Sequence, residues 1–390
     1  MKIRCSALVL YGVGRKNLSE NTIPQVLASA VPFSPISLSD LNLMRSHLLH
    51  SHFSYRDIPV INKTLLPLFT SLMLMGCQAQ TAVLPKSQKL SADKVAEIAA
   101  TIERTYPKLS TEIRGQLLNT VVKSLDNMVF VEGGEFQMGD FGWPYDDDPK
   151  NLCDWPCGVD LERMGNISMD GDDDFVHPVK LSSYSFSKYQ ITLADFDLFF
   201  IAQGKALFDA DKRMRVELHD NFFVPTFPAP AQSWQEAKDY CNWLGKLSNY
   251  PVDLPTEAQW EYAARSRGQY VAFPTDNGSL DYGRNYPAPG MGRTFPVDRF
   301  VPNPLGIYNL TGNATDWVND WYGKDYYRTA PLINPAGPDT GTLRILRGSG
   351  YAEDPILSSS TVRRWAKEPV LKRHLQGHSF RCAIQSDQPL

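Results

Sequence analysis

The stretch Arg344–Cys382, near the C-terminus, limits the possible folds more than any other part of the chain. Arginines alternate with branched residues over Arg344–Arg347, and a similar pattern returns over Ser379–Ile384. Both patterns predict short buried strands, and Gly348 and Gly350 allow close backbone approach or a bulge. About thirty residues without a regular period lie between them. Loops of this length in compact domains are usually functional or mobile, so we expect a loop-rich fold whose chemistry lies here.

The composition is that of a globular chain that is rich in turns. The 390 residues include 28 prolines and 26 glycines, which favours loops over long helices. Hydrophobic residues make up 43%, an ordinary share for a globular protein. The formal net charge is −4, whereas nucleic-acid-binding domains normally carry a basic surface. We therefore expect no nucleic-acid partner.

An apolar segment begins at Lys63. This basic residue precedes an apolar run of about eleven residues that ends in Leu74-Met75-Gly76-Cys77. The pattern is typical of a bacterial secretory signal with a lipobox, and the run is too short to span a bilayer. We prefer this interpretation to a buried helix. It predicts a periplasmic lipoprotein in which a lipid on Cys77 is the membrane anchor.

Residues 1–59 precede this segment and show no sustained period. Because signal peptides begin close to the initiator, we predict that residues 1–59 are a misassigned or disordered leader. Translation would then start at Met44, or at a non-AUG codon for Val60. Residues 60–77 form the signal peptide in this interpretation. Residues 78–90 are polar with one proline, which suits a tether.

Two amphipathic patterns follow in residues 91–126. Ser91 is the expected N-cap of a helix with an apolar face, and Pro107 ends that helix. Ser110 or Thr111 begins the second helix. Two short helices in succession predict a helical hairpin. We expect the hairpin to pack on the following domain rather than to dock a separate partner.

The main domain is expected at residues 127–386. Met128–Gly139 contains two strand patterns around a Gly-Gly pair, which predicts a β-hairpin. Residues 177–192 alternate like a strand, and helical patterns follow at residues 193–203 and 234–247. Thr256 follows a proline and precedes acidic residues, which predicts the N-cap of another helix.

Residues 140–176 form an acidic loop. It holds clustered carboxylates at Asp146–Asp148, Asp170 and Asp172–Asp174, and it begins at Asp140. Clustered carboxylates can hold calcium, but these lack the regular alternation of an EF-hand loop. We therefore interpret them as a solvated surface.

Five segments, in this order along the chain, carry a resemblance to a known family. They are Val131–Gly139, Leu254–Arg265, Pro304–Trp317, Arg347–Gly350 and Phe380–Cys382, which read VEGGEFQMG, LPTEAQWEYAAR, PLGIYNLTGNATDW, RGSG and FRC. Together they closely resemble the formylglycine-generating enzyme (sulfatase-modifying factor) family over residues 127–386. The resemblance implies the family's single α+β domain, which is related to C-type lectins and low in regular secondary structure.

The resemblance also implies a calcium site. In the family, an asparagine side chain, backbone carbonyls and a glutamate supply the ligands. Here Asn309, Gly312 and Ala314 match those positions, and Asp316 replaces the glutamate. A carboxylate that is one methylene shorter still suits a hard cation at closer approach. We expect calcium there, with a turn and capping motif without metal as the alternative.

The cysteines suggest two disulfides. Cys241 and Cys382 occupy positions at which the family has a disulfide, one on the helix at residues 234–247 and one in the last strand. Closing so long a loop can stabilise a fold by up to roughly 5 kcal/mol in an oxidising compartment. Cys153 and Cys157 form a local pair. A disulfide is favoured there because no second pair completes a tetrahedral zinc site.

The positions of the family's catalytic thiols lack cysteine. As the resemblance implies, the enzymes bind Cu(I) through two thiolates just after the Arg-Gly turn. Counting from Gly348, those positions hold approximately Glu353 and Ser358, and neither side chain replaces a thiolate. We therefore expect no copper and no oxidation of a substrate cysteine. His374 and His378 lie four residues apart without an obvious third ligand, so we interpret them as surface residues.

These observations predict a pseudoenzyme in the bacterial envelope, a lipoprotein whose scaffold binds another envelope or secreted protein. By analogy with catalytically silent relatives, it would be an accessory, regulatory or immunity protein of a secretion system such as type VI. The alternative is a metal-dependent periplasmic oxidase that acts on a peptide or siderophore precursor. A third interpretation, glycan binding, would use Trp317, Trp321 and Tyr322, although these residues are better explained as core.

Overall fold

The computed structural model describes residues 84–144, 148–213, 223–288, 290–351, 358, 360–371 and 377–390, which belong to one compact unit. The predictions for the leader, the signal peptide, Cys77, Glu353 and His374 lie outside the described residues. No helix in the described ranges is both long enough and apolar enough to cross a membrane.

The helices are α3 (Ala92–Thr105), α4 (Thr111–Asp126), α5 (Leu193–Ala202), α6 (Ala210–Arg213), α8 (Trp234–Ser248) and α9 (Glu257–Ala264), with short 3-10 turns η2 (Leu161–Arg163) and η3 (Tyr326–Arg328). The strands are β1 (Met128–Val131), β2 (Gly134–Met138), β3 (His177–Leu181), β4 (Tyr184–Ser187), β5 (Val252–Asp253), β6 (Thr315–Trp321), β7 (Arg344–Arg347), β8 (Arg364–Lys367), β9 (His378–Phe380) and β10 (Ala383–Ile384). Short strands joined by long loops make this an α+β fold with little regular structure, as expected.

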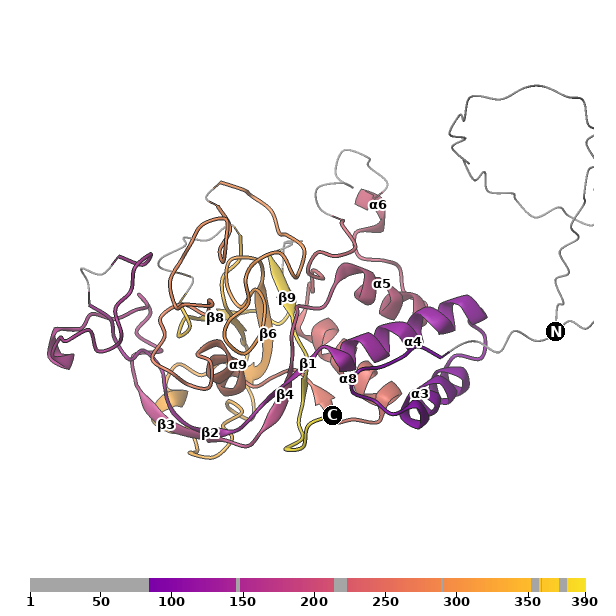
Figure 1. Ribbon diagram of the computed structural model, residues 1–390, viewed down its shortest axis with the longest axis horizontal. Helices are drawn as coiled ribbons and strands as arrows, with labels where there is room; N and C mark the ends of the chain where they lie inside the picture. Colours follow the sequence, from indigo (N-terminus) through magenta and orange to yellow (C-terminus); the bar gives the residue numbers. More distant parts are fainter. Residues whose placement is uncertain are drawn as a thin grey trace, which may run out of the picture. The chain divides into compact units, whose positions relative to one another are not determined.

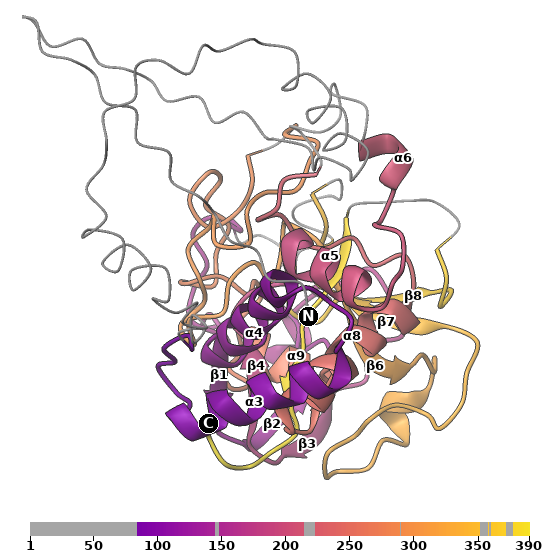
Figure 2. The ribbon, with the colours of Figure 1, turned by 90° about the vertical axis from the view of Figure 1, so that its right-hand side faces the viewer.

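The helical hairpin is part of the main body. Ser91 and Ser110 cap α3 and α4 by accepting backbone N–H groups, as predicted. Apolar residues of both helices belong to one buried cluster with residues of α5 and α8. The hydroxyl of Tyr106, between the two helices, accepts hydrogen bonds from Trp243 Nε1 at 2.9 Å and Gln203 Nε2 at 3.1 Å. Figures 1 and 2 show α3 and α4 beside α8.

Part of the predicted tether is fixed to the fold. The carboxylate of Asp126, at the end of α4, accepts hydrogen bonds from the Ser87 hydroxyl and from the backbone N–H groups of Gln88 and Lys89. The Lys89 ammonium donates to the carbonyl of Met128. Residues 87–89 of the predicted tether are therefore held against the end of α4, because α4 supplies a carboxylate that pairs with their donors.

Three small sheets form the rest of the fold, in the orders β1-β4-β10-β5, β2-β3 and β8-β7-β6-β9. The β-hairpin predicted over Met128–Gly139 is wrong, because β1 pairs with β4 and β2 pairs with β3. The chain changes sheets at Gly133, where a Cβ would lie 2.3 Å from the carbonyl oxygen of Leu181. The two glycines therefore allow a close crossing rather than a tight turn.

The last predicted strand is also divided. β9 pairs in parallel with β6, whereas β10 pairs with β4 and β5. Arg381 and Cys382 lie at the change of sheet, so Cys382 is between two strands and not within one. This break brings the C-terminal segment into contact with both larger sheets.

Candidate functional site

The end of β7 is held by a buried ion network. The guanidinium of Arg347 lies 3.1 Å from the carboxylate of Glu257 and 2.9 Å from that of Glu261, and all three side chains are buried. Glu261 also pairs with Arg265 at 2.9 Å. Thr256 is the N-cap of α9, as predicted, and it also forms a capping box with Gln259. Buried charges persist only when they are paired, so this network fixes the start of the loop after β7.

The first residues of that loop pack on the segment before β6. Gly348 has a φ of +78°, and a Cβ there would lie 2.6 Å from the carbonyl oxygen of Leu310, so only glycine fits. The Ser349 hydroxyl accepts the backbone N–H of Gly312 at 3.0 Å and lies 2.9 Å from the hydroxyl of Thr311. These hydrogen bonds join neutral, buried groups, so Ser349 serves to hold the loop after β7 against the segment before β6.

Cysteine is not available for copper in the described part of this site. Ser358 is buried, and Glu353 lies outside the described residues. The four cysteines of the described ranges form the disulfides Cys153–Cys157 and Cys241–Cys382, which confirms both predictions. The side chains described around the end of β7 therefore do not fit a copper ion held by two thiolates.

The segment matched to the calcium site already has a cation. Both oxygens of Asp316 accept N–H donors, from Gln190 Nε2 at 2.9 Å, Trp260 Nε1 at 3.1 Å and Arg381 Nε at 2.7 Å. The carbonyl of Ala314 accepts a second bond from Gln190 at 2.7 Å. Both oxygens of Asp316 thus already accept donors and its charge is paired with Arg381, whereas the matched oxygen of Asn309, Oδ1, is buried without a hydrogen-bond partner among the described residues. Calcium at this segment stays a prediction, and the pairing with Arg381 weighs against Asp316 as its carboxylate ligand.

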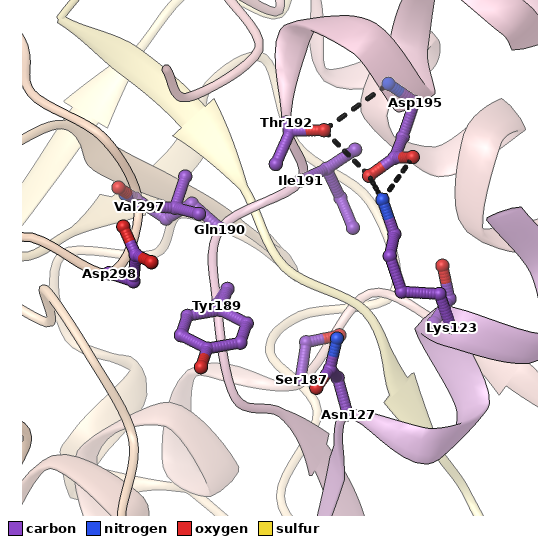
Figure 3. Close-up of a pocket in the computed structure, with 11 residues that line it drawn as sticks. Lys123, Asn127, Ser187, Tyr189, Gln190, Ile191, Thr192, Asp195, Val297 and Asp298 are labelled. Carbon is purple, nitrogen blue, oxygen red and sulfur yellow. Dashed lines mark hydrogen bonds and ion pairs between the residues drawn. The ribbon is translucent and has the colours of Figure 1, made fainter. Parts of the chain in front are cut away.

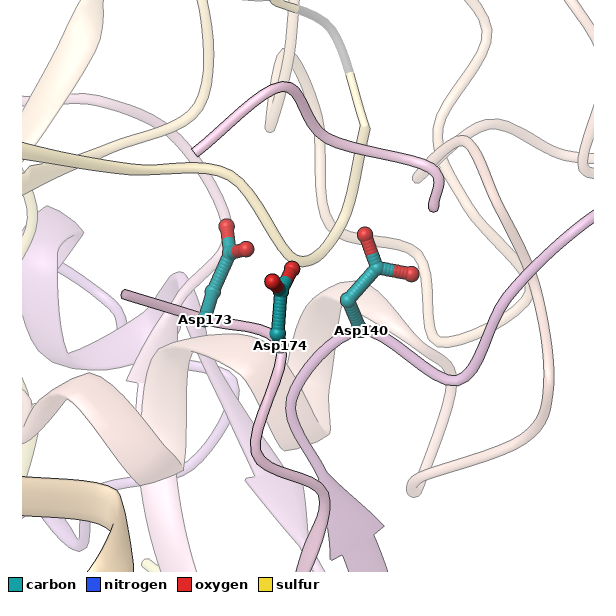
Figure 4. Close-up of side chains that lie close together, drawn as sticks. All are labelled: Asp140, Asp173 and Asp174. Atoms are coloured by element: carbon teal, nitrogen blue, oxygen red, sulfur yellow. The ribbon is translucent and has the colours of Figure 1, made fainter. Parts of the chain in front are cut away.

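A cluster of carboxylates corrects the interpretation of the acidic loop. Asp140, Asp173 and Asp174 have oxygens within 4.8 Å of one another, and the first two side chains are buried (Figure 4). Asp140 accepts the backbone N–H groups of Ile167 at 3.0 Å and Ser168 at 2.8 Å. The loop from residue 165 onward folds back onto Asp140, so the prediction of a solvated surface is wrong for Asp140 and Asp173.

Proton uptake explains how Asp173 stays buried. Burial raises the pKa of Asp173 to about 8, although the Ser168 hydroxyl at 2.7 Å from its carboxylate oxygens acts in the opposite direction. A neutral carboxyl relieves the repulsion from Asp140. This pair could not be predicted from the sequence, because the spacing of acids does not reveal which of them meet backbone donors.

His378 and Trp317 are both buried in the structure. His378 is buried, with Nδ1 2.6 Å from the hydroxyl of Thr315, so the prediction of a surface histidine is wrong. Burial lowers the pKa of His378 to about 4, which keeps the ring neutral. Trp317 is fully buried and donates to the carbonyl of Ala231, as expected for a core residue.

A pocket of about 190 Å³ lies where the hairpin meets the main body (Figure 3). The ammonium of Lys123, on α4, lies 2.6 Å from the carboxylate of Asp195, on α5. The Thr192 hydroxyl donates to the same carboxylate at 2.6 Å. Tyr189 and Asp298 line another side. Lys123, Asp195 and Thr192 thus bond one another and hold the hairpin to the domain.

Comparisons with known proteins agree with the motifs. The formylglycine-generating enzyme of Bos taurus is 37% identical over 140 residues, which cover 33% of this chain and 36% of that protein. The "inactive C-alpha-formylglycine-generating enzyme 2" of Mus musculus is 29% identical over 178 residues, which cover 42% of this chain and 50% of that protein. This chain thus spans between a third and a half of the length of these relatives.

A solved structure, that of PvdO from Pseudomonas aeruginosa, aligns with a TM-score of 0.49 and 24% identity over 66% of this chain and 94% of that chain. The family model of the sulfatase-modifying factor enzyme 1-like domain matches residues 115–386 and therefore begins within α4. The match covers most of the chain and all five motif segments. The protein belongs to the sulfatase-modifying factor enzyme 1-like family.

Proposed function

We propose that this chain is a non-catalytic member of its family, a scaffold that binds another protein. One observation carries the proposal. The positions that match the family's two copper thiols are Glu353 and Ser358, while the cysteines of the described domain are engaged in disulfides. A carboxylate and a hydroxyl are hard ligands, whereas Cu(I) prefers thiolates.

A relative that is named an inactive formylglycine-generating enzyme supports this proposal. A fold with long loops on a core braced by disulfides is a suitable frame for recognition. We place the partner-binding surface at the loop after β7. The partner that we favour is an envelope or secreted protein, with the chain as an accessory, regulatory or immunity component of a secretion system.

Copper binding tests whether the chain is non-catalytic. The purified protein is titrated with Cu(I) under anaerobic conditions, together with the double variant Glu353→Cys, Ser358→Cys. We expect no stoichiometric Cu(I) in the natural protein and one bound ion in the variant. The variant is the positive control, because it restores two thiols to the matched positions. Stoichiometric copper or iron in the natural protein, with turnover of a cysteine peptide, would instead support the alternative, a metal-dependent periplasmic oxidase.

Partner binding is tested separately by affinity capture from envelope extracts. The natural protein and a variant with residues 352–357 replaced by a Gly-Ser linker of equal length are compared. A specific partner that is captured by the natural protein and lost with the variant supports the proposal. Equal capture by both proteins would exclude the loop after β7 as the binding surface.

We also propose that Cys77 anchors the chain to the periplasmic side of a bacterial membrane. The support is the lipobox Leu74-Met75-Gly76-Cys77 after a short apolar run. Metabolic labelling with a fatty acid tests this proposal. Label that is present in the natural protein and lost in Cys77→Ser is the expected result, and a mature protein that still carries residues 1–59 would contradict it.

A further inference from the structure

A surface pocket with aromatic walls lies beside the last part of the loop after β7, where Thr361 donates hydrogen bonds to the carbonyls of Val271 and Ala272. Its volume is about 300 Å³, and it is formed by the loop that contains the local disulfide and by the segment that follows α9. Its lining includes Trp143, Asp154, Trp155, Gln269, Tyr270 and Asn277. Concave sites with aromatic walls and a few polar groups are the usual form of small-molecule sites.

The aromatic walls are held rigidly. The rings of Trp155 and Tyr270 stack with their centroids 3.9 Å apart and their planes 16° apart. The indole N–H of Trp155 donates to the carbonyl of Gly142 at 3.1 Å, and the Cys153–Cys157 disulfide encloses Trp155. A ligand would therefore find the rings already placed, which lowers the entropy cost of binding.

On the buried side of the pocket, the aromatic rings already contact a cation, the guanidinium of Arg265. Phe141 is buried and meets Trp155 and Tyr270 edge-on. The guanidinium of Arg265 lies 4.5 Å from the centroid of Phe141 and 5.5 Å from that of Tyr270. Cation–π attraction is thus used within the fold, on the side away from solvent. Tyr270 remains 38% exposed, so part of its surface is available from outside.

The polar rim decides the class of ligand. Asp154, Gln269 and Asn277 are exposed. Asp154 offers a carboxylate and Gln269 an amide, whereas Asn277 offers its amide N–H groups because its oxygen accepts the backbone N–H and the hydroxyl of Ser279. Such planar groups hydrogen-bond pairs of neighbouring hydroxyls, with oxygens that accept and amide nitrogens that donate. Among the described residues that line the pocket there is no lysine or arginine, which disfavours an anionic ligand. An apolar platform with hydroxyl-binding groups at its edge matches a sugar ring, with its C–H face and its ring of hydroxyls.

We propose that the pocket of Trp143, Trp155 and Tyr270 binds a neutral saccharide, with one pyranose ring on the aromatic wall and its hydroxyls on Asp154, Gln269 and Asn277. The described residues that line this pocket lie outside residues 352–357, which the partner test replaces, so the proposal goes beyond the proposed function and does not depend on it. It also differs from the three aromatic residues considered for glycan binding in the sequence, of which Trp317 is fully buried.

The test uses the full chain and three named probes, maltotriose, cellotriose and chitotriose, each titrated by isothermal calorimetry with ligand-observed NMR. We expect at least one trisaccharide to bind. Tyr270→Ala should weaken that binding by about tenfold, the size expected for losing one aromatic contact. Gln269→Ala should also weaken it, because it removes an exposed amide from the rim.

Two controls separate recognition from folding. Tyr270→Phe keeps the ring and should bind within about threefold of the natural protein. Phe130→Ala removes a ring of similar exposure, 36%, from β1 and should leave the affinity unchanged. Binding of none of the three trisaccharides, binding that Tyr270→Ala does not change, or preferential binding of choline would overturn the proposal.

Discussion

Arg381 and Asp316 form a fully buried ion pair, with Nε of the arginine 2.7 Å from Oδ2 of the aspartate. The same guanidinium donates to the carbonyls of Tyr308 and Asn309. One internal cation therefore joins the break between β9 and β10 to the segment that precedes β6. It pairs with the carboxylate that the family resemblance assigns to calcium.

Removing this cation should be costly. Arg381→Leu leaves the Asp316 carboxylate buried without its charge partner, which we expect to lower the free energy of unfolding by about 3–5 kcal/mol. Urea denaturation measures the change. The control is Arg267→Leu, which breaks an exposed pair with Glu132 and should cost less than about 1 kcal/mol. Equal losses in the two variants would contradict the role given to Arg381.

Calcium should have little effect on the natural protein. Because N–H donors take both oxygens of Asp316, we expect the same melting temperature in excess calcium and in EDTA. Differential scanning calorimetry measures this. A rise in melting temperature with calcium that disappears in Asp316→Asn would restore the calcium interpretation of this segment.

Stability should fall as the pH rises from about 4 to about 8. Burial raises the pKa of Asp173 to about 8, from 3.8 in the unfolded chain, so the folded protein binds this proton more tightly. The stabilisation is complete below about pH 4 and is lost as the pH rises through 8, with a slope of up to about 1.4 kcal/mol per pH unit.

Urea denaturation at pH 5, 7 and 9 tests this slope. Asp173→Asn should reduce it and should be more stable than the natural protein at pH 9. Some slope should remain, because burial also raises the pKa of Asp320 to about 8. Glu162→Gln, an exposed change in the same loop, is the control. An unchanged slope in Asp173→Asn would show that Asp173 is ionised in the folded state.

The two disulfides should differ in their contribution to stability. Cys241 and Cys382 are 141 residues apart, and Cys153 and Cys157 are 4 apart. In the chain-entropy model, replacing the long-range pair by serines costs about 5 kcal/mol and replacing the local pair costs about 2 kcal/mol. Guanidinium denaturation of the two double variants measures both values. A larger loss from the local pair would contradict this order.

Tyr106 should couple the hairpin to the domain. Tyr106→Phe leaves the N–H groups of Trp243 and Gln203 without their acceptor, which should cost about 1–2 kcal/mol. Thermal denaturation measures the loss. Tyr270→Phe, at an exposed position, is the matched control. A variant as stable as the control would show that these two hydrogen bonds are not needed to hold α3 and α4.

Local features of the fold were predictable from the sequence. Ser91, Ser110 and Thr256 cap their helices because a cap depends only on residues three positions away. The pairings of the strands were not predictable in the same way. Met128–Gly139 looks like a hairpin, but its two strands find partners about fifty residues later in the chain.

The features of the candidate site also fall into those that the sequence predicts and those that depend on the fold. The sequence by itself determined the family, the cysteine pairs and the absence of thiols at Glu353 and Ser358, because motif order and residue identity suffice for these. Tertiary structure decided which polar groups are buried and what pairs with them. Asp173 and Asp316 are both aspartates in polar segments. Burial keeps Asp173 neutral, whereas Asp316 forms an ion pair with Arg381. The cost of removing a charge from water depends on donors brought from distant parts of the chain, and only the folded arrangement supplies them.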